Sequence, residues 1–140
     1  MRTIEMHTED VQAAAGVIPE DEPFFMLNLL RYREHADYGD RTDVAPSSGR
    51  EAYHQRYIPA FGQVAAQVAA GGIQVSWVGT VLARVAGPAD ERWDEIAIVE
   101  WPSFAVFQRV TGSPEYKAEA APHRTAALED WRLIATAKVS

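Results

Sequence analysis

The order of apolar and polar positions predicts a short helix and then strand, helix, strand, strand, helix and strand. The first helix is expected to have Thr8 as its N-cap and to end before Gly16. Residues 24–33 are apolar at odd and even positions alike, which is typical of a strand covered on both faces. Residues 50–70 have helical spacing, and Pro59 inside them predicts either a kink or the start of a second helix.

The second half of the chain continues this alternation of strands and helices. Residues 73–86 predict one long strand, in which Gly79 indicates a bulge or bend. Residues 95–101 predict the strand that returns beside it. Ser103 is expected to cap the next helix, a further helix follows, and residues 131–139 form the last strand.

The element order is the split βαβ, or ferredoxin-like, pattern of an α+β fold. It predicts an antiparallel four-stranded sheet with the first and third strands central and helices on one face. We expect residues 1–23 to form an N-terminal extension with a short helix and residues 24–140 to form a single domain. Residues at both odd and even positions of the central strands are apolar. The sheet face without helices would therefore expose more apolar surface than a monomer tolerates. We therefore expect a homodimer through the sheet face.

Composition and charge narrow the classes of partner and site. The chain has 140 residues, a net charge of -7 and no cysteine. The acidic balance argues against nucleic acid as a partner, and the missing thiols exclude disulfides, thiolate metal sites and a cysteine nucleophile. No signal peptide is visible in residues 1–10 and no apolar run is long enough to cross a membrane, so we expect a cytoplasmic protein.

Motifs for metals and organic cofactors are missing from the sequence. The four histidines, His7, His35, His54 and His123, show no metal-ligand spacing. We expect a surface position for His54, and for His123 a helix end where it meets the last carbonyls. There is no glycine-rich phosphate loop and no serine-nucleophile motif, so no cofactor is expected. The polar residues 34–49 form an unusually long loop, and such loops often serve as lids or partner contacts.

Two polar residues in the central strands are candidates for catalysis. Asn28 is an amide in an otherwise apolar strand, where it either contacts a ligand or bonds to neighbouring backbone. Glu100 closes the third strand, where a carboxylate can act as general acid or base. The alternative for Glu100 is an ion pair with an arginine such as Arg31 or Arg124.

Other residues are candidates for binding a substrate. Arg31 and Arg124 would hold an anionic group, since guanidinium binds carboxylate through two bonds, or they would form structural ion pairs. Aromatic side chains would line a pocket for a flat ligand or pack as ordinary core: Tyr53, Tyr57, Trp77, Trp101 and Tyr116.

Several short motifs resemble those of one known family. They are the Asn-Leu-Leu run at 28–30, Tyr53 and Tyr57, the blocks Glu-Trp-Pro-Ser at 100–103 and Ser-Pro-Glu-Tyr at 113–116, and Arg124. With this spacing, residues 24–139 resemble the bacterial domain-of-unknown-function family thirteen-thirty (DUF1330), a branch of the dimeric α+β barrel superfamily. The resemblance implies the fold, the dimer and a pocket between sheet and helices. The superfamily includes cofactor-free monooxygenases, haem-degrading enzymes, lactone isomerases and pure binding proteins.

Three functional hypotheses follow from the sequence and the resemblance. The first is a cofactor-free enzyme for proton transfer or oxygenation of a small organic acid or aromatic substrate, with Glu100 as acid or base, Asn28 orienting the substrate, and Arg124 or Arg31 as the anion clamp. The second is a non-catalytic dimeric module that binds a metabolite or a partner through residues 34–49. The third is haem degradation, which would use Asn28 and Trp101 and needs a histidine on the second helix; only His123 is left for that task.

Overall fold

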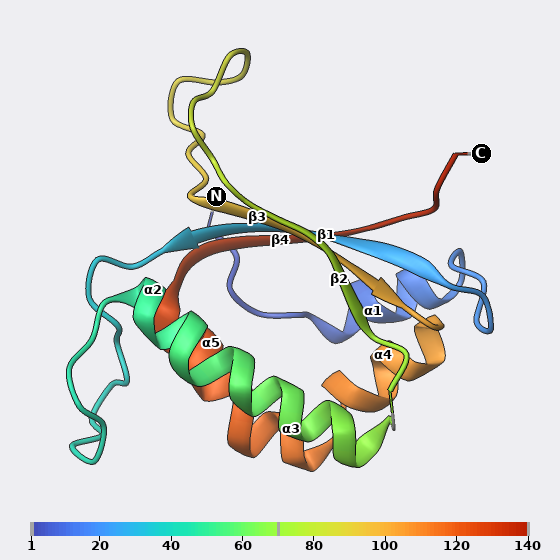
Figure 1. Ribbon diagram of the computed structural model, residues 1–140, viewed down its shortest axis with the longest axis horizontal. Coiled ribbons are helices and arrows are strands. Elements are labelled where there is room, and N and C mark those ends of the chain that lie inside the picture. Colours follow the sequence, from blue (N-terminus) through green and yellow to red (C-terminus); the bar gives the residue numbers. More distant parts are fainter. Residues whose placement is uncertain (1, 70, 140) are drawn as a thin grey trace.

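The core of the fold is a four-stranded antiparallel sheet. A computed structural model describes residues 2–69 and 71–139. Its strands are β1 (Phe24–Tyr32), β2 (Gln74–Thr80), β3 (Glu95–Trp101) and β4 (Leu128–Thr136). They are arranged in the order β2-β3-β1-β4, and each neighbouring pair is antiparallel. The predicted four-stranded antiparallel sheet is confirmed, with the first and third strands in its centre (Figure 1).

The helices lie together on one side of this sheet (Figure 1). They are α1 (Thr8–Ala15), α2 (Gly49–Glu51), η1 (Ala52–Tyr57), α3 (Ile58–Val68), α4 (Phe104–Thr111), η2 (Tyr116–Ala120) and α5 (Ala121–Ala127). The Ser103 side chain accepts a hydrogen bond from the Val106 backbone N–H, so Ser103 is the N-cap of α4, as predicted. The N-cap of α1 is His7 and not Thr8, and it makes no side-chain capping bond.

Two segments of the helical layer, η1 and η2, are π-helical, and each is followed closely by a proline. Pro59 and Pro122 both lie in the first turn of the α-helix that continues the chain. A proline inside a helix lacks an N–H and clashes with the carbonyl four residues earlier, so the preceding turn widens. At Pro59 the helix continues without a break from η1 into α3, so no separate second helix begins there; the change from π-helical to α-helical structure lies at Ile58.

The β2 strand is shorter than its apolar sequence suggests. It ends at Thr80, and residues 81–94 leave the sheet as a long connection to β3. The register shift lies between Val75 and Trp77 and not at Gly79, which stays paired with Ile96. A Cβ at Gly79 would lie 2.6 Å from the Trp77 indole nitrogen, so glycine is needed there for close approach of the ring and not for a bend.

The last strand also begins earlier than predicted, at Leu128 and not at residue 131. The N-terminal residues pack beside this strand. The Thr3 backbone N–H donates to the Asp130 carboxylate over 2.8 Å, and Arg2 pairs with Glu129 at 3.1 Å. The segment before β1 is thus tied to the domain by polar contacts.

The strand registers separate the sheet into two faces. Met26, Asn28 and Leu30 point toward the helices, and we call this the inner face. On the opposite, outer face, one row of apolar side chains crosses all four strands in register: Trp77, Ile98, Leu27 and Ile134. No helix covers that face (Figure 1), and among the described residues no helix is long and apolar enough to cross a membrane.

Candidate functional site

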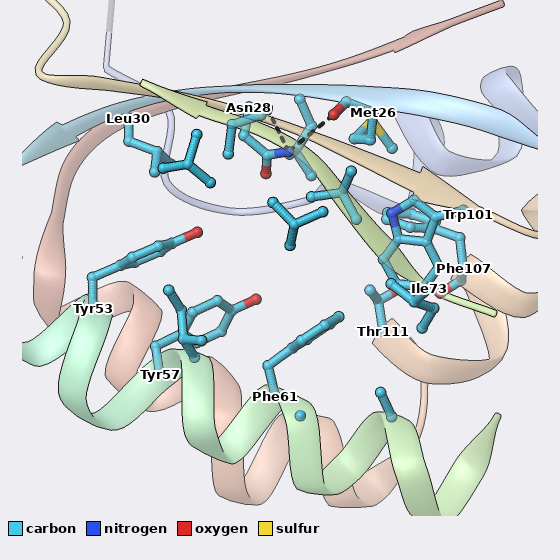
Figure 2. A pocket seen from close by; sticks show the side chains of 18 of the residues that line it. Met26, Asn28, Leu30, Tyr53, Tyr57, Phe61, Ile73, Trp101, Phe107 and Thr111 are labelled. Carbon is cyan, nitrogen blue, oxygen red and sulfur yellow. Dashed lines mark hydrogen bonds between the residues drawn. The ribbon is translucent and has the colours of Figure 1, made fainter. Parts of the chain in front are cut away.

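A cavity of about 900 Å³ lies between the inner face of the sheet and the helices. Its roof is formed by the central strands and its floor by η1 and α3, as Figure 2 shows. Most of its wall is apolar, and aromatic rings from several elements enclose it: Tyr53, Tyr57, Phe61, Trp101, Phe107 and Trp131. A cavity of this size and character suits a small, flat organic molecule.

Asn28 is a polar group in the roof of the cavity. Its Nδ2 donates to the carbonyl oxygens of Met26 at 3.2 Å and Ala97 at 3.3 Å. These two bonds fix the carboxamide, and its Oδ1 accepts no hydrogen bond from any described residue (Figure 2). A held amide with a free carbonyl oxygen is suited to accept a hydrogen bond from a ligand.

Glu95 provides a buried carboxylate at one end of the cavity. Only 3% of the residue is exposed. The Tyr32 hydroxyl donates to Oε1 over 2.6 Å, and His54 Nε2 lies 2.9 Å from the same oxygen. Arg50 reaches Oε2 at 3.1 Å. Both carboxylate oxygens are therefore held, as a buried charge requires.

The pKa of the Tyr32 phenol is raised well above its ordinary value, first by burial and then by its hydrogen bond to Glu95. Tyr32 therefore remains a proton donor to the carboxylate. Since an ionised carboxylate only accepts, a proton on His54 Nε2 fits its contact with Glu95. In the tautomer that carries its proton on Nε2, Nδ1 is an acceptor, so carboxylate and imidazole together can form an acid–base pair.

The local fold explains why these groups meet. Glu95 is the first residue of β3 and has the same parity as Trp101, so it faces inward. In the widened helix η1, the consecutive residues Tyr53 and His54 both line the cavity. Segments of π-helix are frequent at functional sites, and this one carries the histidine to the carboxylate.

A second polar cluster lies in the wall formed by η1 and η2. The hydroxyls of Tyr57 and Tyr116 are 2.8 Å apart, and Arg124 Nη1 donates to Tyr116 over 2.7 Å. Arg124 is only 3% exposed, and its guanidinium stacks on Trp131 at 4.7 Å from the ring centroid. Burial, followed by the neighbouring Tyr116, raises the pKa of Tyr57 well above its ordinary value. The Tyr57 phenol therefore lines the cavity in its neutral form.

The structure brings together part of the predicted set of site residues. Five of them line the cavity: Asn28, Tyr53, Tyr57, Trp101 and Tyr116. Arg124 lies behind the wall, because it binds Tyr116 and does not border the cavity. Trp77 is 60% exposed on the outer face, where it pairs with Ile98.

Glu100 and Arg31 both lie away from the cavity, so the expected roles of Glu100 as acid or base and of Arg31 as anion clamp do not fit this site. Glu100 pairs with Phe25 of β1 and Gln74 of β2, so its side chain belongs to the outer face and does not line the cavity. Arg31 is also on the outer face, where it forms the structural ion pair that was the predicted alternative to anion binding, at 2.7 Å from Glu129 and not with Glu100. The physical reason is the two-residue period of a strand, which places Glu95 inward and Glu100 outward.

Sequence reasoning missed Glu95, Tyr32 and His54. The parity of Glu95 with Trp101 is the one signal in the sequence that indicates an inward carboxylate. His54 had no such signal, because α-helical geometry places it a quarter-turn away from Tyr53. Within the described residues, no group of three or more acidic or histidine side chains is arranged to hold a metal ion.

Comparison with known proteins supports the fold and the membership of a family. No protein-family profile matches the chain, and no curated protein matches it. A crystal structure of RPA0582 from Rhodopseudomonas palustris, described as a protein of unknown function and a structural genomics target, is 34% identical with a TM-score of 0.84. The match covers 100% of this chain and 99% of the other. The crystal structure of methylated RPA0582 gives 35% identity and a TM-score of 0.83, over 99% and 96% of the two chains. The chain therefore belongs to the same protein family as RPA0582 of Rhodopseudomonas palustris.

Proposed function

We propose that the protein binds a small, flat, largely apolar molecule in the inner cavity and transfers a proton to or from it with the Glu95–His54 pair. One observation carries this proposal: a buried carboxylate, held by three side chains, borders an apolar cavity of about 900 Å³. Burying such a charge is costly, and a stable core would be better served by an apolar residue. Active sites are where such groups are retained.

Each polar group of the cavity has a part in the proposed reaction. The Glu95–His54 pair accepts a proton from a carbon or hydroxyl group of the ligand. The Asn28 Oδ1 orients the ligand from the roof, and the Tyr57 hydroxyl, polarised through Tyr116 by Arg124, donates to an oxygen that gains negative charge. The apolar wall excludes water and strengthens these interactions.

We also propose that the domain is a ferredoxin-like dimeric α+β barrel and a member of family thirteen-thirty. The strand order and the placement of the helices support this assignment. In the barrel, a second copy covers the outer face, whose apolar row from Trp77 to Ile134 has no cover within the described chain. His123, the residue left for haem degradation, does not line the inner cavity and contacts Tyr38 at 2.7 Å instead.

The proposed chemistry is tested with 5-nitrobenzisoxazole, a flat aromatic probe. A base removes its ring C–H proton, the N–O bond breaks, and a coloured cyanonitrophenolate forms. We expect the wild-type protein to accelerate this reaction, and Glu95→Gln to lower kcat/KM by at least about 100-fold. His54→Gln is expected to lower it by about tenfold or more, because the second member of the pair is lost.

Glu100→Gln is the matched control, because it makes the same chemical change on the same strand but on the outer face. It should leave the rate within about twofold of wild type. Far-ultraviolet circular dichroism of each variant establishes that the fold is retained. Equal rates for wild type and Glu95→Gln would contradict the proposal, and saturable binding of the probe without turnover would indicate a non-catalytic binding module.

A further inference from the structure

A second cavity, of about 520 Å³, lies outside the inner one. It is bounded by the chain that follows β1, by η2 and by the start of α5, and it shares no lining residue with the inner cavity. The backbone N–H of Asp37 donates to the Ala126 carbonyl over 2.9 Å, which fixes the loop against α5. The loop here belongs to residues 34–49, an unusually long connection for a compact domain.

This cavity is cationic, although the chain as a whole has a net charge of -7. Arg33, Arg41 and Lys117 line it, against the single carboxylate of Asp37. That carboxylate accepts a hydrogen bond of 2.9 Å from the Gly39 backbone N–H. Positive charge is therefore concentrated at this cavity, although the molecule as a whole is acidic.

Two of these cations have no counter-ion among the described residues. Within the part of the chain that the structure describes, neither Arg33 nor Lys117 forms an ion pair, whereas Arg41 binds Asp43 through two bonds of 3.1 and 2.9 Å. Arg33 is half-buried, and its Nε is fully buried with no hydrogen-bond partner among the described residues. The Arg33 guanidinium therefore borders the cavity without a carboxylate or other described group that satisfies it, so it is available to bind an anion there.

The neighbouring residues add to the positive potential. The guanidinium groups of Arg41 and Arg56 lie 5.7 and 5.5 Å from the centroid of the Tyr38 ring. The Tyr38 hydroxyl accepts from Arg56 over 3.2 Å and lies 2.7 Å from His123 Nδ1. The pKa of His123 is lowered, first by burial and then by Arg41 and Arg56, so near neutral pH the imidazole adds no charge and the positive potential comes from the arginines and Lys117.

We propose that this second cavity is a binding site for a phosphate group, either free inorganic phosphate or the phosphate of a small ester. Arg33 and Lys117 are the residues that bind it, and Arg41 can turn to it from Asp43. Phosphate suits the site better than a carboxylate, because its two negative charges and several acceptor oxygens match cations that converge from different elements. The site is independent of the proposed chemistry in the inner cavity.

Isothermal titration calorimetry of the full chain with inorganic phosphate, at constant ionic strength and with acetate in parallel, tests the proposal. We expect one phosphate per chain with millimolar or tighter affinity, and weaker binding of acetate. Lys117→Gln should weaken phosphate binding by about tenfold. Arg33→Gln should weaken it by more, because the half-buried guanidinium of Arg33 can donate two hydrogen bonds to one phosphate. A parallel titration with phenyl phosphate distinguishes the sources: tighter binding than phosphate identifies an ester, and equal or weaker binding identifies the free ion.

Arg109→Gln is the matched control, since Arg109 is exposed on α4, borders neither cavity, and its replacement changes the net charge equally. It should leave phosphate binding unchanged. If Arg33→Gln does not fold, Arg33→Lys is used instead, because it keeps the charge but removes the paired donors of the guanidinium. A loss of phosphate affinity in that variant supports the site. No measurable binding, or an equal loss in Arg109→Gln and Lys117→Gln, would overturn the proposal.

Discussion

The two faces of the sheet are built from the same strands and have opposite characters. On the inner face, aromatic rings and a few held polar groups enclose a cavity, with Glu95 buried at one end. On the outer face, a flat apolar row reaches from Trp77 across Leu27 to Ile134, and charged pairs such as Arg31 with Glu129 lie beyond it. A concave face with buried polar groups suits a small molecule, and a flat apolar face suits another protein surface.

Two glutamates of β3 show the difference most directly. Glu95 and Glu100 are five residues apart, so they lie on opposite faces. Glu95 contacts Tyr32, His54 and Arg50, whereas Glu100 forms no ion pair within the described residues. The chemistry of a carboxylate in this sheet is thus decided by its parity along the strand.

The largest effect is expected from a charge placed on the outer face. Trp77→Glu should weaken the proposed dimer by about 5 kcal/mol, several thousandfold in the dissociation constant, because each dimer would bury two unpaired carboxylates. Sedimentation velocity over a concentration series measures this. Gln67→Glu adds the same charge on the helical side and should leave the dimer intact. A monomeric wild type, or a Trp77→Glu dimer as stable as the wild-type dimer, would contradict the proposal that the outer face binds a second copy of the chain.

The second prediction compares neighbouring leucines of β1. Leu30 is 0% exposed, so Leu30→Ala should lower the free energy of unfolding by about 3 kcal/mol at any protein concentration. Leu29 points outward, and the cost of Leu29→Ala should depend on concentration because it acts through the proposed dimer. Urea unfolding at low and high protein concentration gives both values. Two losses that are equal and independent of concentration would show that a second chain does not cover the outer face.

The third prediction concerns alkaline pH and the inner face. The pKa values of Tyr32, Tyr53 and Tyr57 are raised in the folded protein, mainly by burial, so the stability these neutral phenols contribute is complete below pH 10 and is lost as the pH rises further. Each tyrosine then lowers the free energy of unfolding by about 1.4 kcal/mol per pH unit. Tyr57→Phe should reduce that slope by about this amount in urea unfolding above pH 10. Tyrosinate absorbance that rises before the protein unfolds would show that the inner phenols are accessible to water.

The smallest effect is expected at Gly62, in the helical wall of the inner cavity. A Cβ built on Gly62 meets no atom within 4 Å, so a side chain fits there without a clash. Gly62→Ala should stabilise the protein by about 0.5–1 kcal/mol, because alanine has the higher helix propensity. Thermal unfolding measures the change, with Gly39→Ala as a contrast that should destabilise, since Gly39 has a φ of 67°. A destabilised Gly62→Ala would mean that the space beside this helix is filled in solution.

Much of the fold follows from sequence because its signals are local. The strand at residues 95–101 was predicted at the bounds the structure shows, since apolar residues fill it and turn residues precede it. The helix after Ser103 was also predicted correctly, because a capping side chain marks its start. Such signals depend on a few neighbouring residues, and the rest of the fold has little influence on them.

The composition of the site was harder to predict because it depends on register. A shift between Val75 and Trp77 places Trp77 on the outer face, and no residue in that stretch indicates it. His54 lines the cavity because η1 is π-helical, which only the packing against the sheet and the proline after it explain. Predictions about single side chains fail where one residue of register decides the face.

Binding of 1-anilinonaphthalene-8-sulfonate, followed by fluorescence, tests most directly which face receives a small molecule. We compare wild type with Gly62→Phe, which fills the inner cavity, and with Ile134→Ser, which changes the outer face. We expect one binding site per chain that is weakened at least about tenfold by Gly62→Phe and unchanged by Ile134→Ser. Retained binding in a folded Gly62→Phe variant, together with loss in Ile134→Ser, would contradict it.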